Sequence, residues 1–206
     1  MRSLLLFFVL ALFNISVFAS SYQVEAVIFQ NQNSSDQEIV EAGLDMSALN
    51  NSINLDADNG ANDSFKELSS GFYKLTGIYN ELKYSKNYRP IMHVSWEQPA
   101  LNSSKARYVQ VRSLEGQGES GDPLIKLDGA IRIRSSQFLH ADVDLFYLVK
   151  SIPESMLQTI INMGSGATIE SGYAELKETR RMKLNELHYF DHPAFGLLLR
   201  VSRFGE

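Results

Sequence analysis

The sequence predicts an α+β domain: a mainly antiparallel, strongly curved sheet of long hairpins, with one main helix and one short helix packed on it. Three observations predict it. Several segments alternate apolar and polar residues and are joined by short turns, which is typical of antiparallel strands. Apolar residues recur at helical spacing in one long and one short stretch. The 206 residues suffice for one domain with a real core, and two full domains would be cramped.

The first residues have the pattern of a secretory signal peptide. Arg2 gives a positive start, residues 4–18 form a short apolar core, and Ala19 offers a small residue for cleavage. The core is shorter than the roughly 20 residues that span a bilayer, and it contains Asn14, which disfavours a retained anchor. We therefore expect a signal peptide over residues 1–19, a single periplasmic domain over residues 20–206, and no membrane span after cleavage.

Composition narrows the class of protein. The chain has no cysteine, which excludes a thiolate nucleophile, a disulfide framework and a lipidated cysteine, and export without disulfides suggests the bacterial periplasm. The net charge is −5, and no Lys or Arg occurs between Arg2 and Lys66. Because this is not the basic footprint of a nucleic-acid binder, we expect no nucleic-acid partner. Residues 31–62, rich in Asn, Asp and Ser, predict a polar, partly disordered loop with a short helical turn near residues 47–49.

The first half of the domain predicts a strand, the main helix and two more strands. Residues 22–30 mix alternation with β-branched and aromatic side chains, which indicates a buried strand. Ser64 and Glu67 make a capping box, and apolar residues then recur in a 3-4-3-4 rhythm up to Leu82, which predicts the main helix. Residues 91–97 and 105–113 are predicted strands.

The best-defined hairpin lies in the middle of the chain. Residues 126–134 and 138–149 predict two long strands joined by a three-residue loop, which puts Ile131 and Ile133 on the apolar face of the second strand. The opposite face gathers charged and titratable residues, and we interpret it as a solvated face of cross-strand ion pairs. They are Arg132, Arg134, His140, Asp142 and Asp144.

The last third predicts a short helix and a C-terminal hairpin. Ser151, with Pro153 and Glu154 after it, indicates a helix start, and the helix ends before Gly164. Residues 169–185 return to strand character. The chain then closes through a strand, a turn and an apolar strand that runs from residue 194 to residue 204.

The C-terminal stretch is the candidate ligand-binding surface, because it gathers basic, acidic, imidazole and aromatic groups around one turn. Arginines offer planar forks for carboxylates, and aromatic rings offer flat faces on which sugar rings can lie. Two residues of the strand at 91–97 are added on the same grounds. The candidate binding residues are Arg180, Arg181, Glu186, His188, Tyr189, Asp191, His192, His93 and Trp96.

Two other classes of function remain open. A periplasmic metal-dependent hydrolase could use His188, Asp191 and His192, and a structural scaffold would leave the hairpin without a ligand. None of the common hydrolase motifs occurs, and the G-x-G-x-x-G pattern at residues 116–121 leads into a strand rather than a helix, which rejects a nucleotide site. We therefore predict a protein that is not an enzyme and needs no metal or other cofactor.

Four sequence blocks carry a resemblance to a known family. They are Tyr22-Gln-Val-Glu25-Ala-Val-Ile-Phe29, Tyr88-Arg89-Pro90-Ile-Met-His93-Val-Ser-Trp96-Glu-Gln98-Pro99, Glu178-Thr-Arg180-Arg181-Met182, and Glu186-Leu-His188-Tyr189-Phe-Asp191-His192-Pro193 with Gly196 beyond it. In this order they resemble the CsiV family of Gram-negative periplasmic proteins. The resemblance implies a peptidoglycan-binding protein that supports cell-wall synthesis, acting with a bifunctional penicillin-binding protein through its outer-membrane lipoprotein activator. It transfers no catalytic or binding residue.

Overall fold

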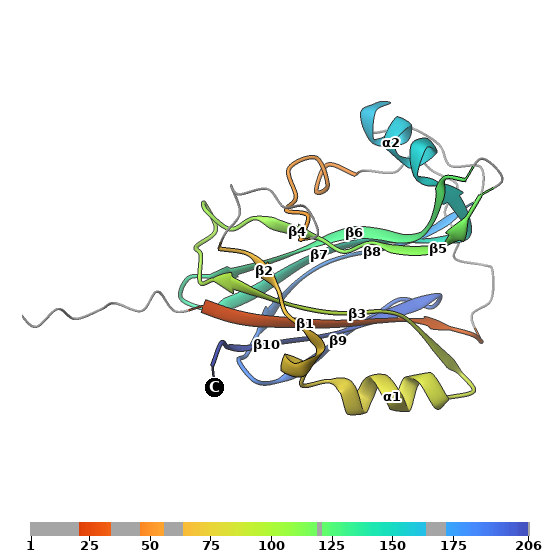
Figure 1. Cartoon of the computed structure of the whole chain (residues 1–206). Coiled ribbons are helices and arrows are strands. Elements are labelled where there is room, and N and C mark those ends of the chain that lie inside the picture. The colour runs from red at the N-terminus through yellow and green to blue at the C-terminus, as the bar shows by residue number, and fades with distance from the viewer. Residues whose placement is uncertain (1–20, 34–45, 56–63, 119–120, 164–171, 206) are drawn as a thin grey trace, which may run out of the picture.

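Two antiparallel sheets stacked face to face make up most of the described chain (Figure 1). The computed structural model describes residues 21–33, 46–55, 64–118, 121–163 and 172–205, so the predicted signal peptide lies outside it. Sheet A has the strand order β2 (Lys66–Glu67), β3 (Tyr88–Pro99), β1 (Ser21–Asn31), β10 (Phe195–Arg203) and β9 (Leu187–Asp191). Sheet B has the order β4 (Tyr108–Gln110), β6 (Pro123–Ser135), β7 (Leu139–Pro153) and β8 (Tyr173–Met182), with β5 (Ser113–Gln117) also paired to β6.

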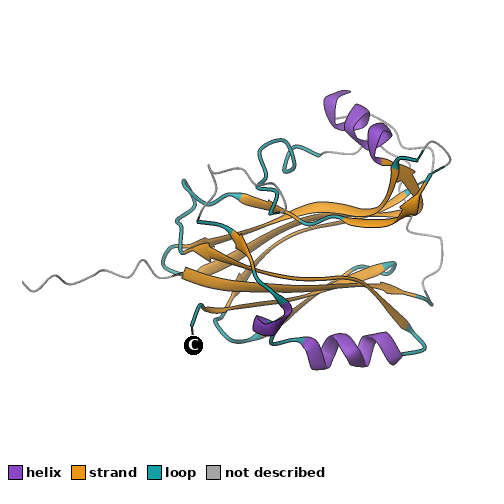
Figure 2. Cartoon of the chain, viewed as in Figure 1, coloured by secondary structure: helices purple, strands orange, loops and turns teal. Residues whose placement is uncertain are grey.

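The prediction of one strongly curved sheet is wrong, because the strands divide between two layers and neither layer is strongly curled (Figure 2). The chain passes from sheet A to sheet B after β3 and returns to sheet A at the turn after β8. Asn185 there adopts a left-handed backbone with φ of 64°, which Asn tolerates better than most residues, and its N–H bonds to Val201 O of β10 at 2.8 Å. The chain thereby leaves sheet B and enters sheet A. The antiparallel pairing and the presence of two helices are as predicted.

The main core lies between the sheets, where each strand turns its apolar alternate residues inward. Trp96 of β3, Ile131 of β6 and Leu197 of β10 belong to it and are fully buried. The predicted three-residue loop length and the shared face of Ile131, Ile133, Ala141 and Val143 are confirmed, but the loop is residues 136–138 rather than 135–137, so the pairing is shifted by two residues and Ile133 pairs with Ala141.

The charged face of that hairpin is not solvated as expected. Asp142 and Asp144 are only 5% and 4% exposed. Asp142 accepts hydrogen bonds from Arg132 Nε at 2.8 Å, Arg134 Nε at 2.9 Å and Thr179 Oγ1 at 2.8 Å. These bonds outweigh the penalty of burial and hold the pKa of Asp142 below its ordinary value.

The main helix is shorter than predicted and begins later. α1 runs from Thr76 to Tyr84 on the outer face of sheet A, and a short 3-10 helix (Ser70–Phe72) precedes it (Figure 1). The capping box at Ser64 is not used, because residues 66–68 join the edge of β3 instead, where Leu68 N–H bonds to Ser95 O at 2.8 Å. Tertiary pairing therefore overrides the local helix signal.

A second, smaller core covers the outer face of sheet B. α2 (Glu154–Met163) begins at the predicted glutamate, although Ser151 belongs to β7, and it packs Leu157 against that face. The described part of the polar loop joins it. Met46, Ala48 and Leu49 enter this second core from the expected turn, at residues 46–52, whereas Ile53 is buried in the main core and bridges to Val109.

Candidate functional site

The C-terminal hairpin does not present its predicted binding residues on one surface. Pairing with β10 fixes β9 so that His188 and Phe190 share the inner face with Leu199 and Leu197, whereas Tyr189 points outward. The expected strand alternation thus divides the motif between the two faces of sheet A. Only its outward half can meet a ligand at that face.

Trp96 must be removed from the binding residues. Its side chain is fully buried between the sheets, and its Nε1–H donates to Gln98 Oε1 at 2.8 Å. A ring in the core cannot stack on a sugar, so the role of Trp96 in this strand is packing.

His93 also serves the structure. Its ring lies between those of Tyr73 and Tyr79, at 4.5 and 5.0 Å, under α1. Its Nε2 donates to Glu25 Oε1 at 2.8 Å. The sequence reasoning did not single out Glu25 as a functional residue, and nothing in one sequence places a β1 residue beside the helix.

Glu25 fixes the start of α1. Its two carboxylate oxygens accept the N–H groups of Lys74 and Leu75 at 2.8 and 2.9 Å, although the side chain is only 2% exposed. Burial by itself would raise the pKa of Glu25, but the hydrogen bonds from His93 and the two N–H groups hold the pKa below its ordinary value. A carboxylate here also faces the positive end of the helix dipole. Glu25 and His93 thus connect the start of α1 to strands β1 and β3.

The two arginines lie on opposite faces of β8, as strand alternation predicts. Arg180 bridges the sheets: its Nη1 donates to Tyr189 O at 2.6 Å, its Nε donates to Glu178 Oε1 at 2.8 Å, and its guanidinium lies 4.5 Å from the Phe190 ring centroid. Arg181 is exposed on the outer face of sheet B, stacked on Phe138 at 3.4 Å. They therefore do not form one cationic surface.

The hydrolase hypothesis receives no support from the geometry. His188 Nε2 accepts the N–H of Lys183 at 3.2 Å, and His192 Nδ1 accepts the N–H of Ala194 at 3.1 Å. Glu186 is exposed in the turn before β9 and pairs with Lys183 at 3.1 Å. Among the described residues, no group of three His, Asp or Glu side chains is placed to hold a metal ion.

What the structure does bring together is an exposed set of rings that we call the aromatic shelf: Phe29, Tyr88 and Tyr189, with Asp191 beside them. Phe29 is buried; the Tyr189 ring stacks on it at 6.0 Å and the Tyr88 ring meets it edge-on at 5.2 Å. Tyr88 and Tyr189 are 37% and 44% exposed. Two of these residues, Phe29 and Tyr88, were not predicted.

Two features make the shelf rigid. Gly196 lies beneath it, where an added Cβ would stand 2.7 Å from Phe29 and 2.8 Å from Tyr189, so both rings sit directly on the backbone of β10. The Tyr189 hydroxyl donates to Asp191 Oδ1. Burial and the hydrogen bond and charge of Asp191 raise the pKa of Tyr189 well above its ordinary value, so the hydroxyl stays a donor.

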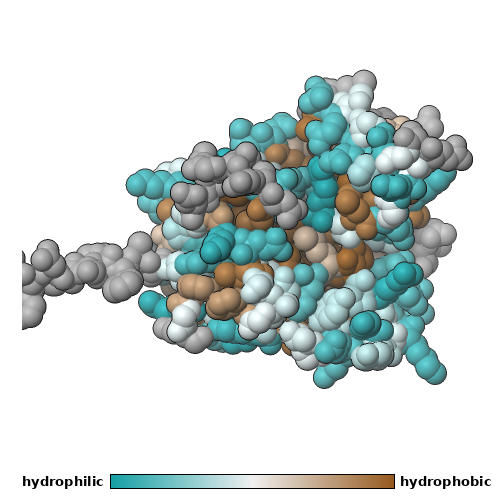
Figure 3. All heavy atoms as spheres, in the orientation of Figure 1, coloured by the Kyte–Doolittle hydropathy of each residue, from teal (hydrophilic) through white to brown (hydrophobic). Residues whose placement is uncertain are grey.

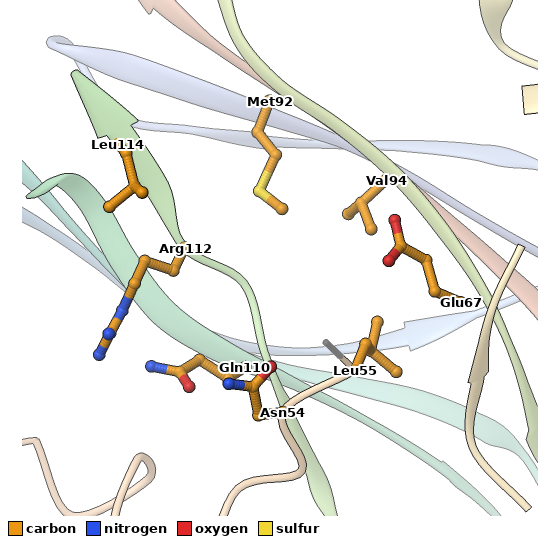
Figure 4. A pocket seen from close by; sticks show the side chains of 8 residues that line it. All are labelled: Asn54, Leu55, Glu67, Met92, Val94, Gln110, Arg112 and Leu114. Carbon is orange, nitrogen blue, oxygen red and sulfur yellow. The ribbon is translucent and has the colours of Figure 1, made fainter. Parts of the chain in front are cut away.

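A cleft also opens between the free edges of the two sheets, which we call the edge cleft. One of its hollows has a volume of about 130 Å³ and is lined by the eight side chains shown in Figure 4. Apolar Leu55, Met92 and Leu114 share it with the amides of Asn54 and Gln110. Figure 3 shows apolar residues reaching the surface between the two layers.

The chain is a two-sheet protein whose described residues offer exposed rings and a cleft but no assembled metal cluster. The family comparison makes the class specific. Residues 2–204 match the family model described as "Peptidoglycan-binding protein, CsiV", so the chain belongs to the CsiV family of peptidoglycan-binding proteins.

The other comparisons add no relative: no curated protein and no solved structure matches the chain. Membership in a peptidoglycan-binding family implies a location in the cell envelope. The described helices are all too short or too polar to cross a membrane.

Proposed function

We propose that this protein is a non-enzymatic periplasmic protein that binds peptidoglycan at the aromatic shelf and thereby supports cell-wall synthesis. The observation that carries the proposal is the exposed face of Tyr189, held flat on buried Phe29 beside the carboxylate of Asp191. The signal-peptide pattern of residues 1–19 supports the periplasmic location.

The shelf has the chemistry that a glycan strand requires. A sugar ring presents an apolar face of C–H groups and a rim of hydroxyl and acetamido groups. Tyr189 and Tyr88 offer apolar ring surface, and the second oxygen of Asp191 can accept from a sugar hydroxyl or an amide N–H. Because the rings are already ordered by Phe29 and Gly196, binding costs little side-chain entropy.

The resemblance to the CsiV family extends the proposal to protein partners. A bifunctional penicillin-binding protein and its outer-membrane lipoprotein activator would meet the protein in the periplasm.

Sedimentation with purified sacculi tests the proposal. The wild-type protein is expected to sediment with sacculi, and Tyr189→Ala to remain largely in the supernatant. Phe72→Ala is the matched control, because Phe72 is 51% exposed and its ring meets that of Phe204, beyond the end of β10 opposite to Gly196. Thermal melts check that both variants fold.

Two results would contradict the proposal. Full sedimentation of folded Tyr189→Ala would remove the shelf as the binding surface. Release of soluble sugar or peptide from the sacculi by the wild-type protein would show wall cleavage, which a non-enzymatic binder cannot perform.

A further inference from the structure

A second hollow of the edge cleft lies at the same end of the sandwich as the aromatic shelf. It has a volume of about 160 Å³ and adjoins the first hollow at Leu114, which lines both. Gln30 of β1 and Arg89 of β3 form its sheet A side, and Glu115 of β5 and Lys126 of β6 form its sheet B side.

Positive charge exceeds negative charge in this hollow. Lys126 lies 3.3 Å from Glu115, whose carboxylate also accepts from the Ser151 hydroxyl at 2.5 Å. The side chain of Arg89 is exposed and forms no hydrogen bond or ion pair with another described residue. Two cations therefore share one carboxylate, and the Arg89 guanidinium keeps its planar fork available for a ligand carboxylate.

The neighbouring hollow differs in charge. Its own cation, Arg112, is already paired with Asp128 at 2.9 Å and with Glu154. The rest of its lining offers the carboxylate of Glu67, apolar surface from Met92 and Leu114, and amide groups, which together suit an amino group, small aliphatic side chains and peptide bonds.

The edge of β3 runs along the cleft and offers main-chain groups as well. Ser95 O accepts Leu68 N–H on the side away from β1, so alternation turns the N–H and C=O of His93 to that same side. From Arg89 to Val94 the strand spans roughly 15 Å, the length of four or five extended residues. A short peptide with a carboxylate at one end matches the order of charge, main-chain groups and apolar surface along this edge.

We propose that the edge cleft binds the carboxylate-bearing stem peptide of peptidoglycan, while the aromatic shelf binds the sugar. This inference rests on the proposed function. The sites are adjacent because Phe29 and Tyr88 belong to the shelf, and their chain neighbours Gln30 and Arg89 line the cleft. Sugar and peptide are covalently joined in the wall, so contact at one site raises the effective concentration at the other.

Separated ligands test the two sites independently. The probes are the free stem tripeptide L-Ala-γ-D-Glu-meso-diaminopimelate, the same tripeptide with its carboxyl groups amidated, and glycan strands stripped of peptide by an amidase. Calorimetry on the full-length mature protein measures each affinity. The wild-type protein is expected to bind the tripeptide and the stripped glycan, and to bind the amidated tripeptide more weakly.

Arg89→Gln provides the decisive comparison. It removes a charge-assisted pair and is expected to weaken tripeptide binding about 10- to 100-fold, while glycan affinity changes less than about twofold. Tyr189→Ala should show the reverse pattern. Arg107→Gln is the matched control, because Arg107 is exposed directly before β4 and far along the sheet from the second hollow. The next residue, Tyr108, pairs with Arg132, which lies six residues along β6 from Lys126.

The outcomes separate this inference from the proposed function. Two results would overturn peptide binding at the edge cleft and leave wall binding at the shelf in place. One is unchanged tripeptide affinity in folded Arg89→Gln. The other is no tripeptide binding by a wild-type protein that does sediment with sacculi. Failure of the wild-type protein to sediment with sacculi would overturn the proposed function instead. Failure of both measurements would overturn both.

Discussion

The anchoring of α1 by Glu25 yields a prediction whose size and pH dependence both follow from the structure. The substitution is Glu25→Gln, which keeps the shape of the side chain and removes its charge. The carboxylate now accepts three hydrogen bonds, from Lys74 N–H at 2.8 Å, Leu75 N–H at 2.9 Å and His93 Nε2 at 2.8 Å. In the variant an amide NH₂ must face one of these donors.

The loss is expected to be large for an isosteric change. Hydrogen bonds to charged groups contribute about 1.5–3 kcal/mol each, and a buried donor left without an acceptor costs a similar amount. Because the glutamine oxygen can keep the bonds from Leu75 and His93, which both go to Oε1, while the Lys74 N–H faces the amide NH₂, the net loss of unfolding free energy should be about 2–4 kcal/mol. For a domain of this size that corresponds to a fall in melting temperature of about 5–15 °C.

The loss must depend on pH. The pKa of Glu25 is lower in the folded than in the unfolded protein, so its charge contributes stability above the unfolded value, near 4.5, and loses it as the pH falls through the folded value. The difference between wild type and Glu25→Gln should therefore be full at pH 7 and shrink below about pH 4.5.

Urea unfolding at a series of pH values measures this difference. Glu81→Gln serves as the control, because Glu81 is exposed on α1 and the same substitution there should change the unfolding free energy by less than about 0.5 kcal/mol at every pH. A Glu25→Gln loss that stays constant down to acid pH, or that equals the control at pH 7, would refute the charge-based account of the helix start.

Two further predictions concern the shelf and sheet B. Gly196→Ala places a Cβ within 2.8 Å of the Tyr189 ring, so it should lower the unfolding free energy measured in urea melts by about 1–3 kcal/mol. At equal folded fraction the variant should also sediment less with sacculi. Unchanged sedimentation would show that the shelf tolerates displacement. Asp142→Asn leaves the Arg134 guanidinium without its anionic partner and should lower the unfolding free energy by about 3–5 kcal/mol. Sedimentation of the folded variant with sacculi should be unchanged. A loss below about 1 kcal/mol would mean that the buried network is dispensable.

Much of the strand arrangement could be predicted because it depends on local alternation. The β6–β7 hairpin shows this well: a three-residue loop, unlike a two-residue loop, puts Ile131 and Ile133 on the same face as Ala141 and Val143, and that shared face is found although the loop lies one residue further along. The same alternation separated Arg180 from Arg181. Such inferences need only the period of a strand and the length of a turn.

The start of the main helix could not be predicted, because it depends on a residue far away in the chain. Ser64 and Glu67 carry a helix-start signal, but the bond from Leu68 to Ser95 draws that segment to the edge of β3. Glu25, about fifty residues earlier, supplies the acceptor for the actual start. Sequence-local signals cannot weigh a partner at that separation.

The candidate site was predicted only in part for a similar reason. Tyr189 and Asp191 do lie on an exposed surface, whereas Trp96 and His93 were chosen for their chemistry and lie in packed interiors. A single sequence shows which groups are available but not which pairs of strands become neighbours. Phe29 joins the shelf only because β1 and β9 both flank β10.

An irregularity in β3 decides which residues reach the shelf and which reach the cleft. Regular alternation from inward-facing Met92 would turn Tyr88 inward and Arg89 outward. Ile91 has no partner in β1, however: Ile28 pairs with Met92 and Phe29 pairs with Pro90, so this bulge reverses the faces of the residues before it. Tyr88 therefore meets Phe29 on the outer face, and Arg89 lines the cleft. One inserted residue thus delivers an aromatic ring to the proposed sugar site and a cation to the proposed peptide site from adjacent positions in the chain.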